Sequence, residues 1–279
     1  MRQLTRSLIS FLAVTSLISA LSFQWRSHAA TLTFQDQTRQ QASQDTAAEI
    51  AQWTAQLSSS DDEERRQAVL MLGALVNRDA APALVTALND SSPRVRAHAI
   101  TGLAALGDRS FIPAIATRLA QDKTGFVRKV AAYGLGRIRS SDATAALTTA
   151  LKDKDIEVRG AAAVSLGEYQ DATAIPALIA ALNDKQEFVR AQAARALGVN
   201  GRASAQAVPS IVKLLTSDKD SEVKRQAATA LGLIGERSAL PALERAQRSP
   251  DPYLSQAALD AINRIQGPAL SPPRAIENL

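Results

Sequence analysis

The sequence contains no cysteine, and its 279 residues include only two histidines, His28 and His98. Without cysteine there is no thiol nucleophile, no disulfide and no thiolate metal site. A single histidine outside the N-terminal segment cannot supply a zinc finger, an HExxH pair, a histidine-based triad or the His-Glu pairs of a di-iron site. Phosphate loops of the GxxxxGK[ST] or GxGxxG kind are also missing. The sequence therefore offers no catalytic residue, no metal ligands and no cofactor site.

Aromatic residues make up 4% of the chain, too few for a platform that stacks the bases of single-stranded nucleic acid. The formal net charge is +5, from 32 basic and 27 acidic residues. Three of the basic residues, Arg2, Arg6 and Arg26, lie in the first 29 residues, which contain no acidic residue. The remainder has 29 basic residues against 27 acidic ones, a net charge of +2. Nucleic acid is therefore not an expected partner.

The first 29 residues have the three-part layout of a secretory signal peptide. Two arginines precede an uncharged stretch from Leu8 to Phe23, and Ser27-His28-Ala29 then supplies small residues for a signal peptidase. We predict cleavage after Ala29 or Ala30 and export to the periplasm, the thylakoid lumen or the extracellular space. The alternative is an uncleaved membrane anchor formed by residues 7–25, at the lower limit of spanning length.

Polar segments flank the central part of the chain. Residues 30–45 are rich in glutamine and are predicted to form a flexible linker. Residues 268–279 contain three prolines and are predicted to be a disordered tail. The folded part is then expected over residues 46–267.

This central part contains a repeat of about 31 residues. In each repeat an acidic residue precedes a basic residue by six positions, and the basic residues lie 32, 31, 31 and 34 positions apart. The pairs are Asp90/Arg96, Asp122/Arg128, Asp153/Arg159, Asp184/Arg190 and Asp218/Lys224. Alanine follows each basic residue by three positions, and Leu-Gly usually follows by seven and eight. A constant period of this length is typical of stacked repeat architectures.

Each repeat is predicted to contain two helices. Val158, Ala162 and Leu166 follow one another at helical spacing in the second helix, and Ile175 and Leu178 do so in a first helix. Prolines lie near the starts of the first helices. Proline has no amide hydrogen, and an amide hydrogen in the first turn of a helix would have no acceptor within the helix. These prolines are Pro82, Pro113, Pro176, Pro209 and Pro241. We predict that the glycine of Leu-Gly reverses the chain after the second helix by taking a left-handed conformation.

The complete frame resembles the HEAT-repeat family, in particular the short repeats of phycobilin lyases, over about Ala47 to Gln266. The resemblance implies an all-α fold, a right-handed α-solenoid of about seven antiparallel helix pairs. It also implies a structural ladder in which the acidic and basic residues of neighbouring repeats pair. Its predicted members are Asp90, Arg96, Asp122, Arg128, Asp153, Arg159, Asp184, Arg190, Asp218 and Lys224. The alternative is that the five basic residues form an anion-binding column.

The two end repeats depart from this frame, as the caps of a solenoid do. In the first, Ser59 takes the acidic position before Arg65; in the last, Ser249 and Ser255 take both positions.

In HEAT solenoids the second helices line the concave side. In each full repeat a valine comes directly before the basic residue. The side chains two and six positions after this valine should form one ridge on the concave side. Gly160 and Val164 would leave the middle of this surface bare, between larger polar and aromatic residues. The predicted partner-binding residues are Lys129, Tyr133, Gly160, Val164, Gln192, Arg195 and Arg225. The alternative is an ordinary solvated face.

These observations predict an exported, non-enzymatic scaffold that binds a partner protein or peptide through its concave face, without a cofactor. Membrane contact is expected only through the N-terminal segment, if that segment is not cleaved. The alternative function, which the resemblance implies through the repeat type, is that of a phycobilin lyase-like subunit or chaperone acting on a tetrapyrrole-carrying protein.

Overall fold

The computed structural model describes residues 39–168 and 170–267. The predicted signal peptide or anchor and the predicted tail lie outside these residues. The chain divides into two units, Met1–Trp53 and Thr54–Leu279. None of the helices in the described part of the chain combines the length and the apolar character that a membrane span requires.

The first described helix covers residues 39–56, so residues 39–45 of the predicted linker are helical. Side chains four positions apart bond along this helix. Gln41 Nε2 donates to Asp45 Oδ1 at 2.9 Å, and Trp53 Nε1 donates to Glu49 Oε1 at 3.4 Å. The same glutamine-rich composition that led to the linker prediction also contains good helix formers, which explains the difference.

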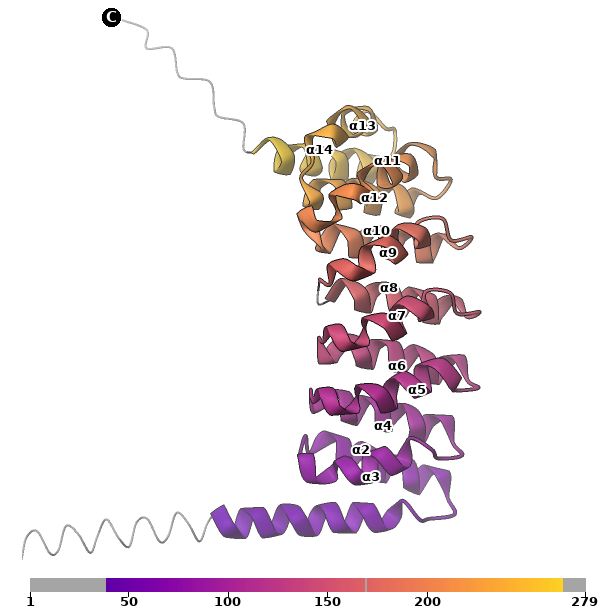
Figure 1. The fold of residues 1–279 in the computed structure, drawn as a ribbon, viewed down its shortest axis with the longest axis vertical. Helices are drawn as coiled ribbons and strands as arrows, with labels where there is room; N and C mark the ends of the chain where they lie inside the picture. Colours follow the sequence, from indigo (N-terminus) through magenta and orange to yellow (C-terminus); the bar gives the residue numbers. More distant parts are fainter. Residues whose placement is uncertain (1–38, 169, 268–279) are drawn as a thin grey trace, which may run out of the picture. The chain divides into compact units, whose positions relative to one another are not determined.

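Helix α2 (Asp62–Ala74) is followed by six helical hairpins, which lie one above the other in Figure 1. Their first helices are α3 (Ala81–Ala87), α5 (Ile112–Gln121), α7 (Thr144–Ala150), α9 (Ile175–Ala181), α11 (Val208–Ser217) and α13 (Leu240–Ala246). Their second helices are α4 (Pro93–Ala105), α6 (Gly125–Ile138), α8 (Ile156–Glu168), α10 (Glu187–Val199), α12 (Ser221–Ile234) and α14 (Pro252–Gln266). No strand occurs among the described residues. The prediction of an all-α solenoid is confirmed.

The core follows the repeat frame. The valine before each basic residue and the alanine three positions after it are fully buried in every full repeat. They are Val95, Val127, Val158, Val189, Val223, Ala99, Ala131, Ala162, Ala193 and Ala227. Each second helix packs against its own first helix and against the second helices of the neighbouring repeats. One continuous hydrophobic core therefore joins the hairpins.

A short 3₁₀-helix precedes each first helix, which the sequence pattern did not predict. The six are η1 (Arg78–Ala80), η2 (Arg109–Phe111), η3 (Ser141–Ala143), η4 (Ala172–Ala174), η5 (Gly201–Ala207) and η6 (Arg237–Ala239). Polar side chains cap several of them: Asp108 Oδ1 accepts from the Ser110 amide and Asp171 Oδ1 from the Thr173 amide, both at 2.9 Å. The five predicted prolines then lie in the first turn of α3, α5, α9, α11 and α13.

The prediction for the glycine of Leu-Gly is wrong. Gly167, Gly198 and Gly232 lie inside α8, α10 and α12 and are buried against the next second helix. A β-carbon on Gly198 would lie 2.8 Å from Ala230 Cα, and one on Gly232 would lie 2.7 Å from Ala261 Cα. These glycines allow close approach of neighbouring helices. The left-handed conformation occurs further along the chain, for example at Gly235 (φ 80°).

Candidate functional site

A ladder of five arginine–aspartate pairs runs through the turns of the hairpins. In each pair the arginine Nε donates to one carboxylate oxygen at 2.7–2.8 Å, and Nη2 donates to the other at 2.8–3.0 Å. The pairs are Arg65–Asp90, Arg96–Asp122, Arg128–Asp153, Arg159–Asp184 and Arg190–Asp218. None of these side chains is more than 16% exposed. The ladder therefore consists of largely buried, bidentate ion pairs between consecutive repeats.

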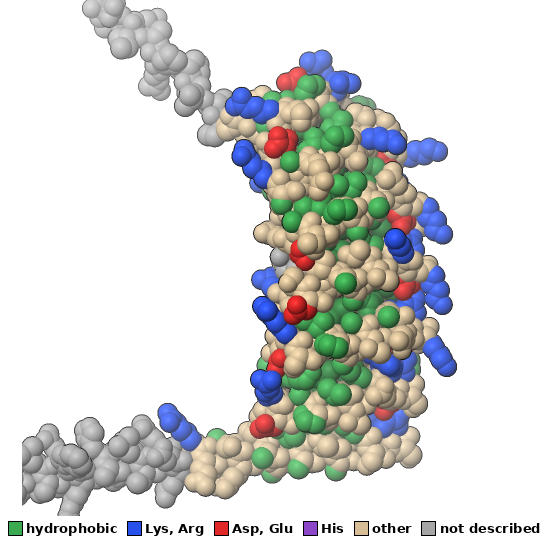
Figure 2. All heavy atoms as spheres, in the orientation of Figure 1, with side chains coloured by type: hydrophobic (Ala, Val, Ile, Leu, Met, Phe, Trp, Pro, Cys, Tyr) green, Lys and Arg blue, Asp and Glu red, His purple; other side chains and the backbone are tan. Residues whose placement is uncertain are grey.

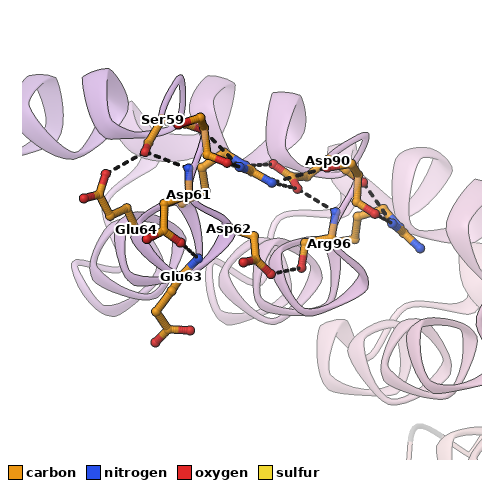
Figure 3. A network of polar contacts seen from close by, with 11 residues as sticks. Ser59, Asp61, Asp62, Glu63, Glu64, Asp90 and Arg96 are labelled. Carbon is orange, nitrogen blue, oxygen red and sulfur yellow. Dashed lines mark hydrogen bonds and ion pairs between the residues drawn. The ribbon is translucent and has the colours of Figure 1, made fainter.

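Each arginine also binds the turn of its own repeat. Arg96 Nη1 donates to the Asp90 carbonyl, six residues earlier, at 2.9 Å, and Arg128 does the same to Asp122. The Asp90 carboxylate instead binds Arg65 and accepts the Ser92 amide at 2.8 Å. Figure 3 shows Asp90 and Arg96 within this network of polar contacts. Within one repeat, the arginine therefore binds the backbone carbonyl of the aspartate six positions earlier. The carboxylate of that aspartate binds the arginine of the preceding repeat.

The ladder differs from the predicted set at both ends. Arg65 in α2, which was not among the predicted members, forms the first pair and also donates from Nη1 to the Ser59 carbonyl at 2.9 Å. Lys224, which was predicted, makes no ion pair with any described residue. The acidic position of the following repeat is Ser249, so a carboxylate for Lys224 is missing there.

The electrostatics of the ladder favour ionised pairs. Burial opposes the charge of Asp153, but hydrogen bonds from Arg128 and from the Asp155 amide outweigh it and hold the pKa of this carboxyl below its usual value. The pKa of each of the other four ladder aspartates is lowered by the same causes. The hydrogen bond to Asp153 in turn raises the pKa of Arg128. With these donors bound inside the protein, the ladder does not present the free cations that an anion-binding column needs.

Three of the predicted partner-binding residues make contacts of their own. Lys129 Nζ lies 3.6 Å from a Glu157 carboxylate oxygen and 5.9 Å from the centre of the Phe126 ring. Arg225 bonds to Glu222 and Asp251 and lies over the ring of Tyr253. These two cations are therefore already paired within the protein.

The third of them, Gly160, is buried rather than bare. A β-carbon at this position would lie 2.1 Å from the Phe188 ring. The predicted bare floor is wrong at this position because the aromatic ring of the next repeat covers it, which a pattern within one repeat does not show.

Val164, Gln192 and Arg195 do come together, in a hollow of about 260 Å³ between α8 and α10. A second hollow of about 550 Å³ adjoins it between α6 and α8, and Tyr133 lines that one. The two hollows share three lining residues, Arg139, Val164 and Glu168. We call the combined surface the α6–α10 groove. It is defined by Tyr133, Arg137, Arg139, Val164, Glu168, Gln192, Arg195 and Val199.

The groove combines exposed apolar groups with cations. Tyr133 is 45% exposed and Val199 is 41% exposed. Arg139 Nη2 lies 3.4 Å from Glu168 in a largely solvent-exposed pair. Arg195 is exposed and makes no ion pair with any residue in the described ranges. The carbonyl oxygen of the Gln192 side chain is buried and has no hydrogen-bond partner there.

Sequence reasoning missed the groove residues Arg137, Arg139, Glu168 and Val199, although a signal for Arg137, Glu168 and Val199 was present. The predicted ridge used positions two and six after each valine. A further step of four residues along the same helix face reaches these three positions. The predicted ridge therefore ended one helical turn too early.

A larger hollow, of about 670 Å³, lies at the turns that join first and second helices. Its lining includes Lys152, Lys154 and Lys185 beside the Arg159–Asp184 pair of the ladder. Figure 2 shows Lys and Arg side chains along both edges of the stack, with hydrophobic side chains between them. These three lysines place positive charge at the turns, outside the α6–α10 groove. No group of three or more His, Asp or Glu side chains placed for a metal ion occurs within residues 39–168 and 170–267.

Comparison with known proteins identifies the repeat. A family model described as HEAT repeats matches residues 50–136, 112–198 and 184–263. The chain belongs to the HEAT-repeat family. Among solved structures, the Escherichia coli protein YibA is similar with a TM-score of 0.60 at 22% identity, over 79% of this chain and 82% of that one. This likeness shows the shared HEAT-type fold alone.

Two further structures are similar. An engineered protein has 25% identity and a TM-score of 0.51 over 78% of this chain and 68% of its own. The complex of CpcE and CpcF of phycocyanin lyase from Nostoc sp. PCC7120 has 25% identity and a TM-score of 0.49, over 78% and 88%. No curated protein matches the sequence. The bilin-related role stays a prediction from the sequence resemblance; a change in a bilin absorption spectrum on mixing with the protein would support it.

Proposed function

We propose that this HEAT-repeat protein is a non-enzymatic scaffold that holds a segment of a partner protein in the α6–α10 groove. The observation that carries the proposal is the exposed side chain of Arg195, which has no ion pair with any described residue although the ladder arginines are all paired. Exposed Val199 and Tyr133 lie on the same groove. An arginine and an aromatic residue beside a hollow are the groups that most often anchor protein interfaces.

The groove is built on three helices that the core and the ladder join to one another. Its walls are α6, α8 and α10, which pack directly against one another. The Arg128–Asp153 and Arg159–Asp184 pairs fix the spacing between these three helices. A surface that is already in its binding conformation loses little conformational entropy when a partner binds.

The test uses the double variant Tyr133→Ala/Arg195→Glu and the partner obtained by affinity purification with the wild-type protein. We expect the variant to keep its helical circular dichroism and to lose partner binding by more than tenfold, because an anchor and a cation are removed together. Lys185→Glu is the control, since it makes the same charge change in the hollow at the turns. Unchanged binding by the double variant would contradict the proposal.

We also propose that the protein acts outside the cytoplasm. The signal-peptide layout of residues 1–29 and the absence of cysteine support this location. Mass spectrometry of the mature protein should find an N-terminus directly after Ala29 or Ala30, in an envelope or lumen fraction. Recovery of the full-length chain from the cytosol would exclude this proposal.

A further inference from the structure

The side chain of Gln192 is the least satisfied polar group of the α6–α10 groove. Its Oε1 atom is buried and accepts no hydrogen bond from any described residue. Gln226 lies one helix further on, in α12, and its Nε2 atom donates to Glu222 Oε1 at 2.7 Å. A buried acceptor without a donor destabilises a folded protein. Gln192 as a whole is partly exposed, so rotation of its terminal amide turns the oxygen toward the hollow, where a donor that arrives with a ligand can reach it.

The charge of the groove indicates the sign of that ligand. Arg137, Arg139 and Arg195 line the groove, and Glu168 is its one acidic lining residue. Glu168 lies beside Arg139, whereas Arg137 and Arg195 have no ion pair with any described residue. A carboxylate matches a guanidinium in both charge and shape.

The apolar lining indicates how the ligand lies. Val164 and Val199 face the same hollow as Gln192 and Arg195. A hollow of about 260 Å³ accommodates the side chains of a few residues. An extended chain places successive side chains on opposite sides and leaves backbone N–H groups available between them.

From these observations we propose that the α6–α10 groove binds an extended acidic peptide segment of the partner. One backbone N–H donates to Gln192 Oε1 after the amide has turned toward the groove, a glutamate or aspartate carboxylate pairs with Arg195, and a small apolar side chain packs on Val164 and Val199. This inference rests on the proposed scaffold function and names the chemical class of its partner.

The first test needs no ligand. Replacing the unsatisfied amide with an apolar group of similar size, Gln192→Leu, should raise the melting temperature by about 1–3 °C, because a buried acceptor without a partner is removed. Gln226→Leu is the matched control and should leave the melting temperature unchanged or lower it, since it breaks the bond to Glu222. A lower melting temperature for Gln192→Leu would show that the amide is satisfied in the free protein and would overturn the proposal.

The second test measures binding of a labelled, end-capped octapeptide of alternating glutamate and valine by fluorescence anisotropy. The matching lysine–valine peptide should not bind. Arg195→Glu should weaken binding of the acidic peptide at least tenfold and Gln192→Leu about fivefold, while Lys185→Glu should change it less than twofold. Equal binding of the two peptides, or equal loss with Lys185→Glu, would overturn the proposal.

A third arm separates the possible failures. If the acidic peptide fails to bind while Tyr133→Ala/Arg195→Glu still abolishes partner capture, the peptide class is wrong and the scaffold function stands. If vesicles containing an anionic phospholipid bind in an Arg195-dependent manner and the peptide does not, the groove is a membrane contact and the proposal fails.

Discussion

At the scale of single residues, the ladder arginines each hold two repeats together. Arg128 binds both carboxylate oxygens of Asp153 and the carbonyl of Asp122. Asp153 is fixed from its other side by the Asp155 amide at 2.8 Å. Loss of either side chain would leave a buried charge without its counter-ion, which costs more than the pair contributes when it is intact.

The variant Arg128→Met should therefore lower the free energy of unfolding by about 3–5 kcal/mol, because Asp153 remains buried and unpaired. Urea unfolding followed by circular dichroism measures this change. Arg78→Met is the control, since Arg78 is 77% exposed in its pair with Asp108 and its removal should have little effect. Similar losses for the two variants would show that burial does not distinguish the ladder.

The pH dependence of stability follows from the lowered pKa of the ladder aspartates. A carboxyl whose pKa is lower in the folded than in the unfolded state stabilises the fold at pH values above its ordinary pKa of 3.8, and this contribution is lost as the pH falls through the folded value. Asp153→Asn should then destabilise the protein near neutral pH, and the difference from the wild type should shrink as the pH approaches about 3. Urea midpoints measured across this range test the prediction; a constant difference would contradict it.

The ladder residues show what can and cannot be predicted from the sequence. The constant spacing of acid and base, read with the family resemblance, pointed to pairing between neighbouring repeats. It could not show that Arg96 reaches the carbonyl of Asp90 while its guanidinium binds the carboxylate of Asp122, since this depends on how far the repeats are apart. For the groove, the sequence supplied Val164, Gln192 and Arg195, which lie together, but also Gly160, which the next repeat covers with Phe188.

At the scale of helices, packing of second helix on second helix depends on small residues. The Leu-Gly glycines were predicted to reverse the chain because the left-handed conformation is the commonest local reason for glycine at a helix end. The reason that applies here is not local, since Ala230 and Ala261 belong to the following repeats. Sequence patterns within one repeat describe its own helices well and the contacts of those helices with the next repeat poorly.

Gly198→Ala should destabilise the protein by about 1–3 kcal/mol, because the new β-carbon would lie 2.8 Å from the Ala230 backbone and α10 and α12 must move apart. Thermal unfolding measures the loss. Gly107→Asn is the control: Gly107 has φ of 66°, a β-carbon added there would meet no neighbour within 4 Å, and asparagine tolerates this conformation. A neutral Gly198→Ala would show that the two helices have room to separate.

At the scale of the whole molecule, the repeats are equivalent, so one complete repeat can be removed from the stack. Removal of residues 144–174 takes out one complete repeat, and Ile175 then follows Ala143 directly, at the start of a first helix. Arg128 would meet Asp184 in place of Asp153, and Gly136 would meet Ala196 in place of Ser165. We expect this deletion protein to remain helical and to unfold cooperatively.

The same deletion removes Val164 and Glu168 from the α6–α10 groove and brings Tyr133 of α6 one repeat closer to Arg195 of α10. Partner binding should weaken although the fold is kept, because the spacing of Tyr133 and Arg195 changes and the apolar contact with Val164 is gone; circular dichroism and a binding assay on the same sample measure both. Deletion of an equivalent unit outside the groove, residues 81–111, is the control and should retain binding. A deletion protein that binds as tightly as the wild type would contradict a role for Val164, Glu168 and the spacing of the two anchors.

The end positions of the ladder bear on how copies of this protein meet. Every internal junction up to Asp218 joins an arginine to an aspartate, whereas the corresponding terminal positions are Ser59 at one end and Ser255 at the other. Two copies brought end to end would place serine opposite serine at the ladder positions, without the ion pair that joins the internal repeats. The repeat that gives the solenoid its regularity thus lacks the contact that would extend it into a fibre.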